Sequence, residues 1–170
     1  MNNLINTCLF LTKGQSLKDW DKNGILDREL NIYRNLIKLK IIKLTIISYA
    51  QEDEFKLLNN IEDRNINIIY NKNKLSNFFN LISIIFLKFS YFNKVKIFKS
   101  NQERGALWAL IYSKIFFSKF IFRSGYSLRH HIKKKYGRIT FEYFYAYINN
   151  FLCSYFSSAI VITSKSFIDY

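Results

Sequence analysis

The chain has 170 residues, of which 49% are hydrophobic and 22% charged. This composition excludes an intrinsically disordered protein and provides enough apolar material for one hydrophobic core. The formal net charge of +14 favours anionic partners such as nucleotides, nucleic acid or acidic lipid. Lysine is spread over the whole length, however, and an even distribution is typical of a solvated surface. We therefore do not expect nucleic acid to be the partner.

The chain carries no signal that places it outside the cytoplasm. Its N-terminus lacks the basic region and the long apolar region of a signal peptide. The apolar runs 78–92 and 141–162 are too short or too often interrupted by polar residues to span a bilayer, and we interpret them as buried or interfacial helices. Cys8 and Cys153 lie inside apolar runs without metal-site spacing, which predicts two buried thiols in a reducing compartment.

Strand-like and helix-like segments alternate along the chain. The first strand is expected at 4–12, followed by a loop at 13–24 and a helix from Leu26 whose apolar residues recur at helical spacing. A short helix follows the acidic residues 52–54. Further strands are expected at 41–49, 66–70, 95–99, 119–123 and 159–163, and further helices at 75–92, 106–116 and 131–155, the last broken near Gly137. This alternation predicts an α/β fold, a Rossmann-like parallel sheet with helices on both faces.

Three loops follow strands at the edge of such a sheet where ligands bind, outside the carboxyl ends of the strands. They are 13–24, 100–105 and 123–127, and each contains a glycine and polar side chains. A glycine loop that leads from a strand into a helix directs backbone N–H groups at a phosphate or a sugar. A single glycine in such a loop is also common in plain structural turns, and the pattern GxGxxG is not satisfied here. The loop alone therefore does not distinguish a phosphate or sugar site from a structural turn.

Four segments in order resemble one known family. They are TKGQSLKDWDKNGILDRELNIYRNL at 12–36, FKSNQERGALWALIYSK at 98–114, KFIFRSGYS at 119–127 and AIVITSKSFIDY at 159–170. Together they resemble the N-terminal half of family 4 glycosyltransferases of the GT-B fold, and the resemblance spans nearly the whole chain. Members of that family have two Rossmann-like domains with the active site between them. The N-terminal domain holds the acceptor, and the C-terminal domain holds the nucleotide-sugar donor.

The resemblance implies that residues 1–170 form a single acceptor-side domain and that the donor-binding domain is absent. It implies part of a retaining glycosyltransferase, inactive alone, that transfers a sugar to a polysaccharide or lipid-linked acceptor. The implied partners are a nucleotide-sugar donor, that acceptor and a separate chain with the donor domain. Because many members act on lipid-linked sugars at the inner membrane face, it also implies peripheral contact of lysines 133–135 with anionic lipid.

The resemblance also implies a set of substrate-binding residues: Lys13, Gly14, Ser16, Trp20, Asn101, Gln102, Arg123, Gly125 and Tyr126. Gly14 would approach the donor phosphates through its backbone, and Lys13 and Ser16 beside it would bind acceptor or phosphate. Trp20 would offer an aromatic face to a sugar ring or, alternatively, fill the loop as an apolar plug. Arg123 would stabilise a leaving diphosphate or hold an anionic acceptor.

Two of the implied site residues have an equally good structural role, and one loop departs from the family. Asn101 and Gln102 would bind sugar hydroxyls or make ordinary loop hydrogen bonds. The 123–127 loop stands where many relatives place a histidine, so no catalytic residue is assigned. His130 and His131 are adjacent on a helix and have no carboxylate or cysteine at ligand spacing, which predicts no metal site. No cofactor is predicted.

The alternative function, from a different class, is a basic protein that binds nucleic acid or a membrane surface through its lysines. The aromatic residues count against it, because they recur at core spacing inside strands and helices. In a nucleic-acid surface they would alternate with Arg and Lys on one exposed face.

Overall fold

A computed structural model describes residues 4–59, 61–125, 128–136 and 140–163. Six strands form one sheet in the order β3-β2-β1-β4-β5-β6, and all neighbouring strands are parallel. They are β1 (Ile5–Phe10), β2 (Ile42–Ile47), β3 (Ile66–Ile69), β4 (Ile97–Ser100), β5 (Lys119–Ser124) and β6 (Ala159–Ile162). The strand order reverses between β1 and β4, which is the switch point of a Rossmann-like sheet. The predicted α/β fold is confirmed.

The helices alternate with these strands. They are α1 (Leu17–Lys22), α2 (Leu26–Lys38), α3 (Asn77–Leu87), α4 (Phe89–Phe92), α5 (Ala106–Ile115), α6 (Leu128–Tyr136) and α7 (Phe141–Tyr155), with 3-10 turns η1 (Phe55–Leu57) and η2 (Ile61–Asn65). The six predicted strands are confirmed to within two residues at each end. The helix predicted at 131–155 is two helices, because α6 ends at Tyr136 and α7 begins at Phe141, and Gly137 itself lies outside the described residues. The first of them begins at Leu128, three residues earlier than predicted.

Two predicted segments differ in detail. The loop predicted at 13–24 contains α1, whose N-cap Ser16 and third residue Asp19 form a reciprocal capping box. That pattern stabilises a short helix by satisfying first-turn N–H groups, and the sequence alone would have indicated it. The helix predicted at 75–92 ends at Leu87, and a separate turn of helix, α4, begins at Phe89.

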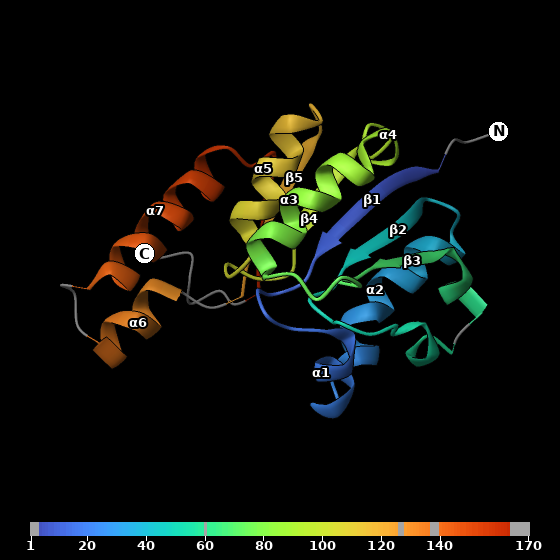
Figure 1. Ribbon diagram of the computed structural model, residues 1–170, viewed down its shortest axis with the longest axis horizontal. Helices are drawn as coiled ribbons and strands as arrows, with labels where there is room; N and C mark the ends of the chain where they lie inside the picture. The colour runs from blue at the N-terminus through green and yellow to red at the C-terminus, as the bar shows by residue number, and fades with distance from the viewer. Residues whose placement is uncertain (1–3, 60, 126–127, 137–139, 164–170) are drawn as a thin grey trace.

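The two faces of the sheet are covered by different helices, as Figure 1 shows for α2 on one side and α3 and α5 on the other. Successive side chains of β4 point to opposite faces of the sheet, so neighbouring residues contact different helices. Phe98 meets Tyr112 of α5 with ring centroids 5.9 Å apart. The next residue, Lys99, lies 4.8 Å from the ring centroid of Tyr33 on α2. Tyr112 also donates to the carbonyl of Leu81 on α3 at 2.5 Å, which joins that helix to the same aromatic core.

A buried ion pair attaches α2 to η2. Nε and Nη2 of Arg34 each donate to an Asp63 carboxylate oxygen at 2.9 Å, and only 2% of the Asp63 side chain is exposed. A bidentate pair of this kind satisfies both carboxylate oxygens, which is what makes the burial of two charges tolerable.

Small residues let α5 lie close to the sheet. Ala106 and Ala109 are fully buried. Gly105, the N-cap of α5, has φ +99°, and a Cβ built there would lie 2.9 Å from the carbonyl oxygen of Leu11. A side chain at this position would therefore press on the backbone that follows β1.

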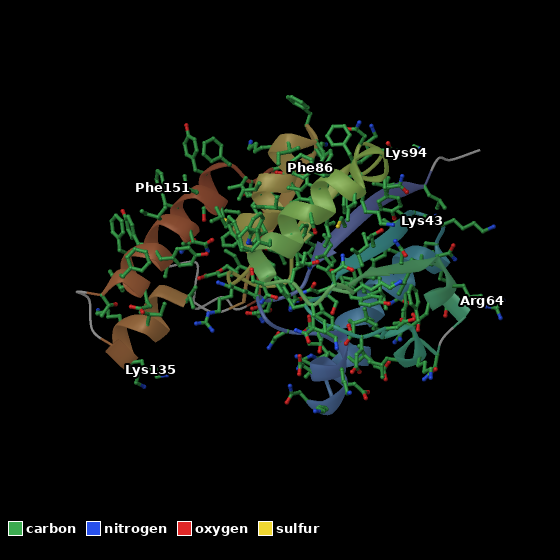
Figure 2. The ribbon with its side chains drawn as sticks, in the orientation of Figure 1. Lys43, Arg64, Phe86, Lys94, Lys135 and Phe151 are labelled. Carbon is green, nitrogen blue, oxygen red and sulfur yellow. The ribbon has the colours of Figure 1, made fainter. Side chains whose placement is uncertain are left out.

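Helix α7 buries one face and exposes another. Ala146, Asn149 and Cys153 are buried, whereas an outer face carries exposed apolar residues three and four positions apart: Phe141, Phe144, Ile148, Phe151 and Tyr155. Figure 2 shows Phe151 pointing away from the rest of the molecule, and Phe86 of α3 is likewise exposed. Among the described residues, no helix combines the length and apolar character that crossing a bilayer requires.

Candidate functional site

The loops that follow β1, β4 and β5 contact one another at the carboxyl edge of the sheet. The backbone N–H of Asn101 donates to the carbonyl of Phe10 at 2.8 Å, and the N–H of Lys13 donates to the carbonyl of Arg104 at 3.1 Å. Nη1 of Arg123 donates to Oδ1 of Asn101 at 3.0 Å. The three predicted loops therefore lie together, at the edge where ligands of parallel sheets bind.

A hollow of about 540 Å³ opens beside the first loop. Its polar lining includes Lys13, Gly14, Arg104 and Glu142, and its apolar lining includes Leu128 and Ile132 of α6. The N-terminal end of α5 borders it through Gly105, and the first amide groups of a helix favour negative charge. Two cationic side chains against one carboxylate, with a helix N-terminus and an apolar wall beside them, suit a ligand with an anionic and an apolar part.

A second charged cluster lies on the α2 side of the same edge. Nη1 of Arg123 donates to Glu29 on α2 at 2.5 Å. Burial raises the pKa of the Glu29 carboxyl, but the hydrogen bonds and charges of Arg123 and Arg28 outweigh burial and hold that pKa below its ordinary value. Glu29 is therefore ionised at neutral pH and fixes the guanidinium of Arg123 in place.

Lys99, on the neighbouring strand β4, belongs to the same cluster. Its Nζ donates to the hydroxyl of Tyr33 at 2.7 Å, and Tyr33 is a buried residue of α2. Burial, with the charge of Arg123 acting in the same direction, lowers the pKa of Lys99 to about 8, while Glu29 opposes the change. A lysine with this pKa changes its charge in the mildly alkaline range.

Two buried glutamates fasten the loops of this edge to helix ends. Glu103 accepts a hydrogen bond from the N–H of Leu128 at 2.8 Å, at the start of α6, and one from the Ser124 hydroxyl at 2.6 Å. Glu54 accepts from the N–H of Lys18 at 2.7 Å, in the first turn of α1, and from the Ser48 hydroxyl. Carboxylates at helix N-termini satisfy N–H groups that have no partner within the helix.

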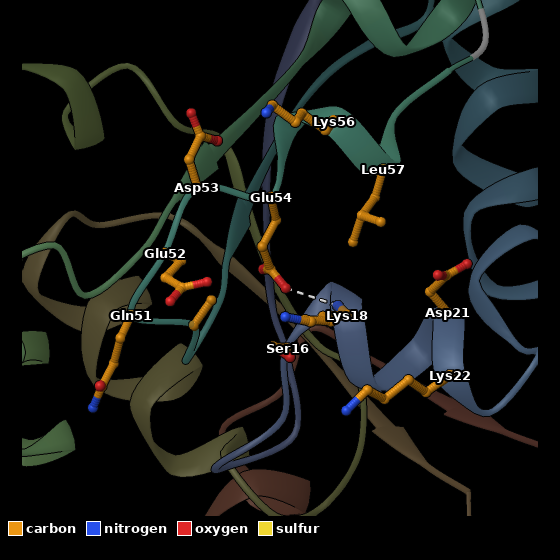
Figure 3. A pocket seen from close by; sticks show the side chains of 11 residues that line it. Ser16, Lys18, Asp21, Lys22, Gln51, Glu52, Asp53, Glu54, Lys56 and Leu57 are labelled. Carbon is orange, nitrogen blue, oxygen red and sulfur yellow. Dashed lines mark hydrogen bonds between the residues drawn. The ribbon is translucent and has the colours of Figure 1, made fainter.

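Figure 3 shows the Glu54 contact inside a second hollow, of about 630 Å³, between α1 and the segment 50–57. Both lysine and carboxylate side chains line it: Lys18, Asp21, Lys22, Glu52, Asp53, Glu54 and Lys56. Opposite charges in such numbers largely neutralise one another, so this hollow does not share the cationic character of the first.

The implied site residues have different surroundings. Lys13 and Gly14 are exposed at the first hollow. Gln102 and Gly125 are neighbours, since a Cβ on Gly125 would lie 3.2 Å from Oε1 of Gln102, a buried atom without a hydrogen-bond partner in the described part of the chain. Tyr126 lies outside the described residues, as do the side chains of His130 and His131.

Three of the implied residues are engaged in structure. Trp20 is fully buried, so its ring offers no exposed face to a sugar in this structure, and this burial agrees with the alternative of an apolar plug. The Ser16 hydroxyl belongs to the capping box of α1. Asn101 is buried and bridges loops, because its Nδ2 donates to Thr12 and its Oδ1 accepts from Arg123. For Asn101 the structural role left open by the sequence is the one observed.

The two cysteines are buried, as expected. Burial raises the pKa of both thiols, that of Cys153 to about 12 with a contribution from Glu103. Neither sulfur is therefore a thiolate at neutral pH, and neither has the reactivity of a nucleophile.

Comparisons with known proteins concern the fold. No protein-family model matches the chain, and no curated protein does. A solved structure of Anabaena Alr3699/HepE, in complex with UDP and glucose, is similar with a TM-score of 0.52 and 15% sequence identity. The similar part covers 91% of this chain and 37% of the other, so the chain spans little more than a third of that structure's length. At this identity the likeness shows a shared fold.

Proposed function

We propose that the chain is the acceptor-side domain of a retaining glycosyltransferase, which moves a sugar from a nucleotide-sugar donor to a polysaccharide or lipid-linked acceptor. The observation that carries the proposal is the meeting of the loops after β1, β4 and β5 at the carboxyl edge, where Lys13 and Arg104 of the first two loops line a hollow together with Glu142. The similar fold of a protein that holds UDP and glucose supports it. So does the order of the four segments that resemble family 4 glycosyltransferases.

In this proposal the 170 residues bind the acceptor, and a second domain that they do not include binds most of the donor. Transfer requires that the leaving diphosphate be neutralised while the sugar is held over an acceptor hydroxyl. Lys13 and Arg104 supply positive charge on one wall only. We therefore expect these residues by themselves to bind substrate without transferring sugar.

Binding of glycans, a lipid-linked sugar analogue and UDP-glucose by the chain tests the proposal, measured by calorimetry at rising salt. Saturable, salt-tolerant binding of a sugar ligand that weakens in Arg104→Gln would support it. Arg64→Gln is the matched control, because Arg64 is an exposed arginine on η2 and the charge change is the same. Binding that follows polyanion charge alone, with affinity falling steeply in salt, would favour the nucleic-acid or membrane alternative.

Peripheral contact with an anionic membrane, in the cytoplasm, is part of the same proposal. Lysines 133–135 are exposed on α6, whose buried residues Leu128 and Ile132 pack against Ala146 of α7. Clusters of exposed lysines are attracted to the negative surface of a membrane with anionic lipid. Vesicles with anionic lipid should sediment the chain, and changing lysines 133–135 to Gln should reduce the bound fraction. The same change at the exposed lysines 43, 94 and 96, which lie at the amino ends of strands, should not.

A further inference from the structure

The cluster around Arg123 carries more positive than negative charge. Arg123 on β5, Lys99 on β4 and Arg28 on α2 share one carboxylate, that of Glu29. The other group that faces Lys99 is the Tyr33 hydroxyl, which accepts its hydrogen bond and stays neutral because burial raises the pKa of Tyr33. A half-buried cluster with an excess of cations attracts an anion more strongly than exposed lysines do, since water screens it less.

The orientation of Arg123 leaves one edge of its guanidinium for a ligand. Both contacts to protein, with Glu29 and with Asn101, use Nη1. Within the described residues Nε and Nη2 have no acceptor, and 19% of the side chain is exposed. These two N–H groups form the planar fork that matches two oxygens of a carboxylate or phosphate. Glu29 and Asn101 therefore hold the arginine by one nitrogen and present the other two.

We infer that Arg123, backed by Lys99, binds an oxyanion of the substrate through its Nε and Nη2 groups. Neither Lys99 nor Glu29 was among the residues that the sequence implied. The inference rests on the proposed function only for the source of the oxyanion, which is either the diphosphate of the donor or a phosphate or carboxylate of the acceptor. The binding of the group itself follows from the charge and geometry of the cluster.

The test is a calorimetric titration of the 170-residue chain with UDP, glucose 1-phosphate, glucuronate and uncharged glucose. We expect at least one of the three anions to bind, and Arg123→Gln to weaken that binding by about tenfold or more, because a charge-assisted fork is lost. Arg64→Gln removes the same charge elsewhere and should change it by less than about twofold. The anion bound most tightly identifies the source.

Lys99 gives a second, independent readout through pH. Since Lys99 loses its charge near pH 8, affinity for the anion should fall between pH 7 and pH 9.5, where a phosphate monoester is already doubly ionised. In Lys99→Met the affinity at pH 7 should be several-fold lower and the alkaline fall should disappear. Circular dichroism shows whether each variant is folded. If Arg123→Gln does not fold, Arg123→Lys takes its place, because it keeps the positive charge and loses the two parallel N–H donors.

The results overturn the inference if no anion binds, or if Arg123→Gln and Arg64→Gln weaken binding equally. Failure of the proposed glycosyltransferase function would give different binding results. Anions that bind through Arg123 while no sugar acceptor or UDP-glucose binds would leave the oxyanion site standing without glycosyl transfer. Sugar ligands that bind equally to wild type and Arg123→Gln would leave the proposed function standing without this site.

Discussion

Replacing Gly105 by Ala should destabilise the protein far more than the same change at Gly14. Both glycines have positive φ, +99° and +81°, so alanine at either position meets the left-handed penalty of about 1–2 kcal/mol. At Gly14 nothing lies within 4 Å of the added Cβ. At Gly105 the Cβ would lie 2.9 Å from the carbonyl oxygen of Leu11 and 3.2 Å from the backbone nitrogen of Lys13. Because these are backbone atoms, the loop after β1 must move, which adds about 1–3 kcal/mol.

We therefore expect the free energy of unfolding to fall by about 3 kcal/mol in Gly105→Ala and by about 1 kcal/mol in Gly14→Ala. At this chain length each kcal/mol lowers the melting temperature by about 2–4 °C. Urea denaturation followed by tryptophan fluorescence measures the difference, since Trp20 is fully buried in the folded state. If Gly105→Ala proved no less stable than Gly14→Ala, α5 would not lie against the first loop as described, and the geometry of the site would be wrong.

Three further predictions concern buried groups. Trp20→Ala should lower the free energy of unfolding by about 3–5 kcal/mol, because it leaves a cavity in the core. Trp20→Phe should lower it by less than about 2 kcal/mol, because Nε1 of Trp20 has no hydrogen-bond partner in the described residues that would be lost. If the two variants were equally stable in urea denaturation, Trp20 would not fill the core as described. Asp63→Asn removes the negative charge of the buried carboxylate that binds Arg34, while the contact of Arg34 with the exposed Asp27 remains. It should cost about 1.5–3 kcal/mol, against under about 0.5 for the exposed Asp21→Asn, both measured by urea denaturation. The pKa of Lys99 is lowered on folding, so its charged form opposes folding below about pH 8, and this cost fades as the pH rises towards 10.5. Lys99→Met should therefore raise the free energy of unfolding by up to about 3 kcal/mol at pH 7 and by little at pH 10.5. A gain that does not vary with pH would show that the pKa of Lys99 is not lowered on folding.

The sequence was a good guide to the fold because its signals are local. Apolar runs rich in β-branched residues alternate with helical spacing, and that pattern predicted all six strands and the parallel sheet. The missed helix α1 also had a local signal, the Ser16–Asp19 capping box. The three glycine loops were found by a rule of topology, which needs only the strand order and not the side chains.

The candidate site was less predictable because its contacts join distant parts of the chain. Glu29 meets Arg123 across 94 positions, and no spacing in the sequence indicates that pair. The burial of Trp20 depends on how α1 packs, and the burial of Glu103 and Glu54 depends on helix ends that only the folded chain brings near them. Residue type indicated which side chains are able to bind a ligand, but only tertiary structure separates those that face solvent from those that hold loops together.

The central position of β1 has a consequence for the growing polypeptide. This strand pairs with β2 on one side and with β4 on the other, where Thr7 aligns with Ile97. During synthesis β1, β2 and β3 emerge first, and the second hydrogen-bonding edge of β1 stays without a partner until the ribosome has delivered β4. Nascent chains stalled between β3 and β4 should therefore be sensitive to protease and bind chaperones, and should become resistant once β4 and α5 clear the exit tunnel.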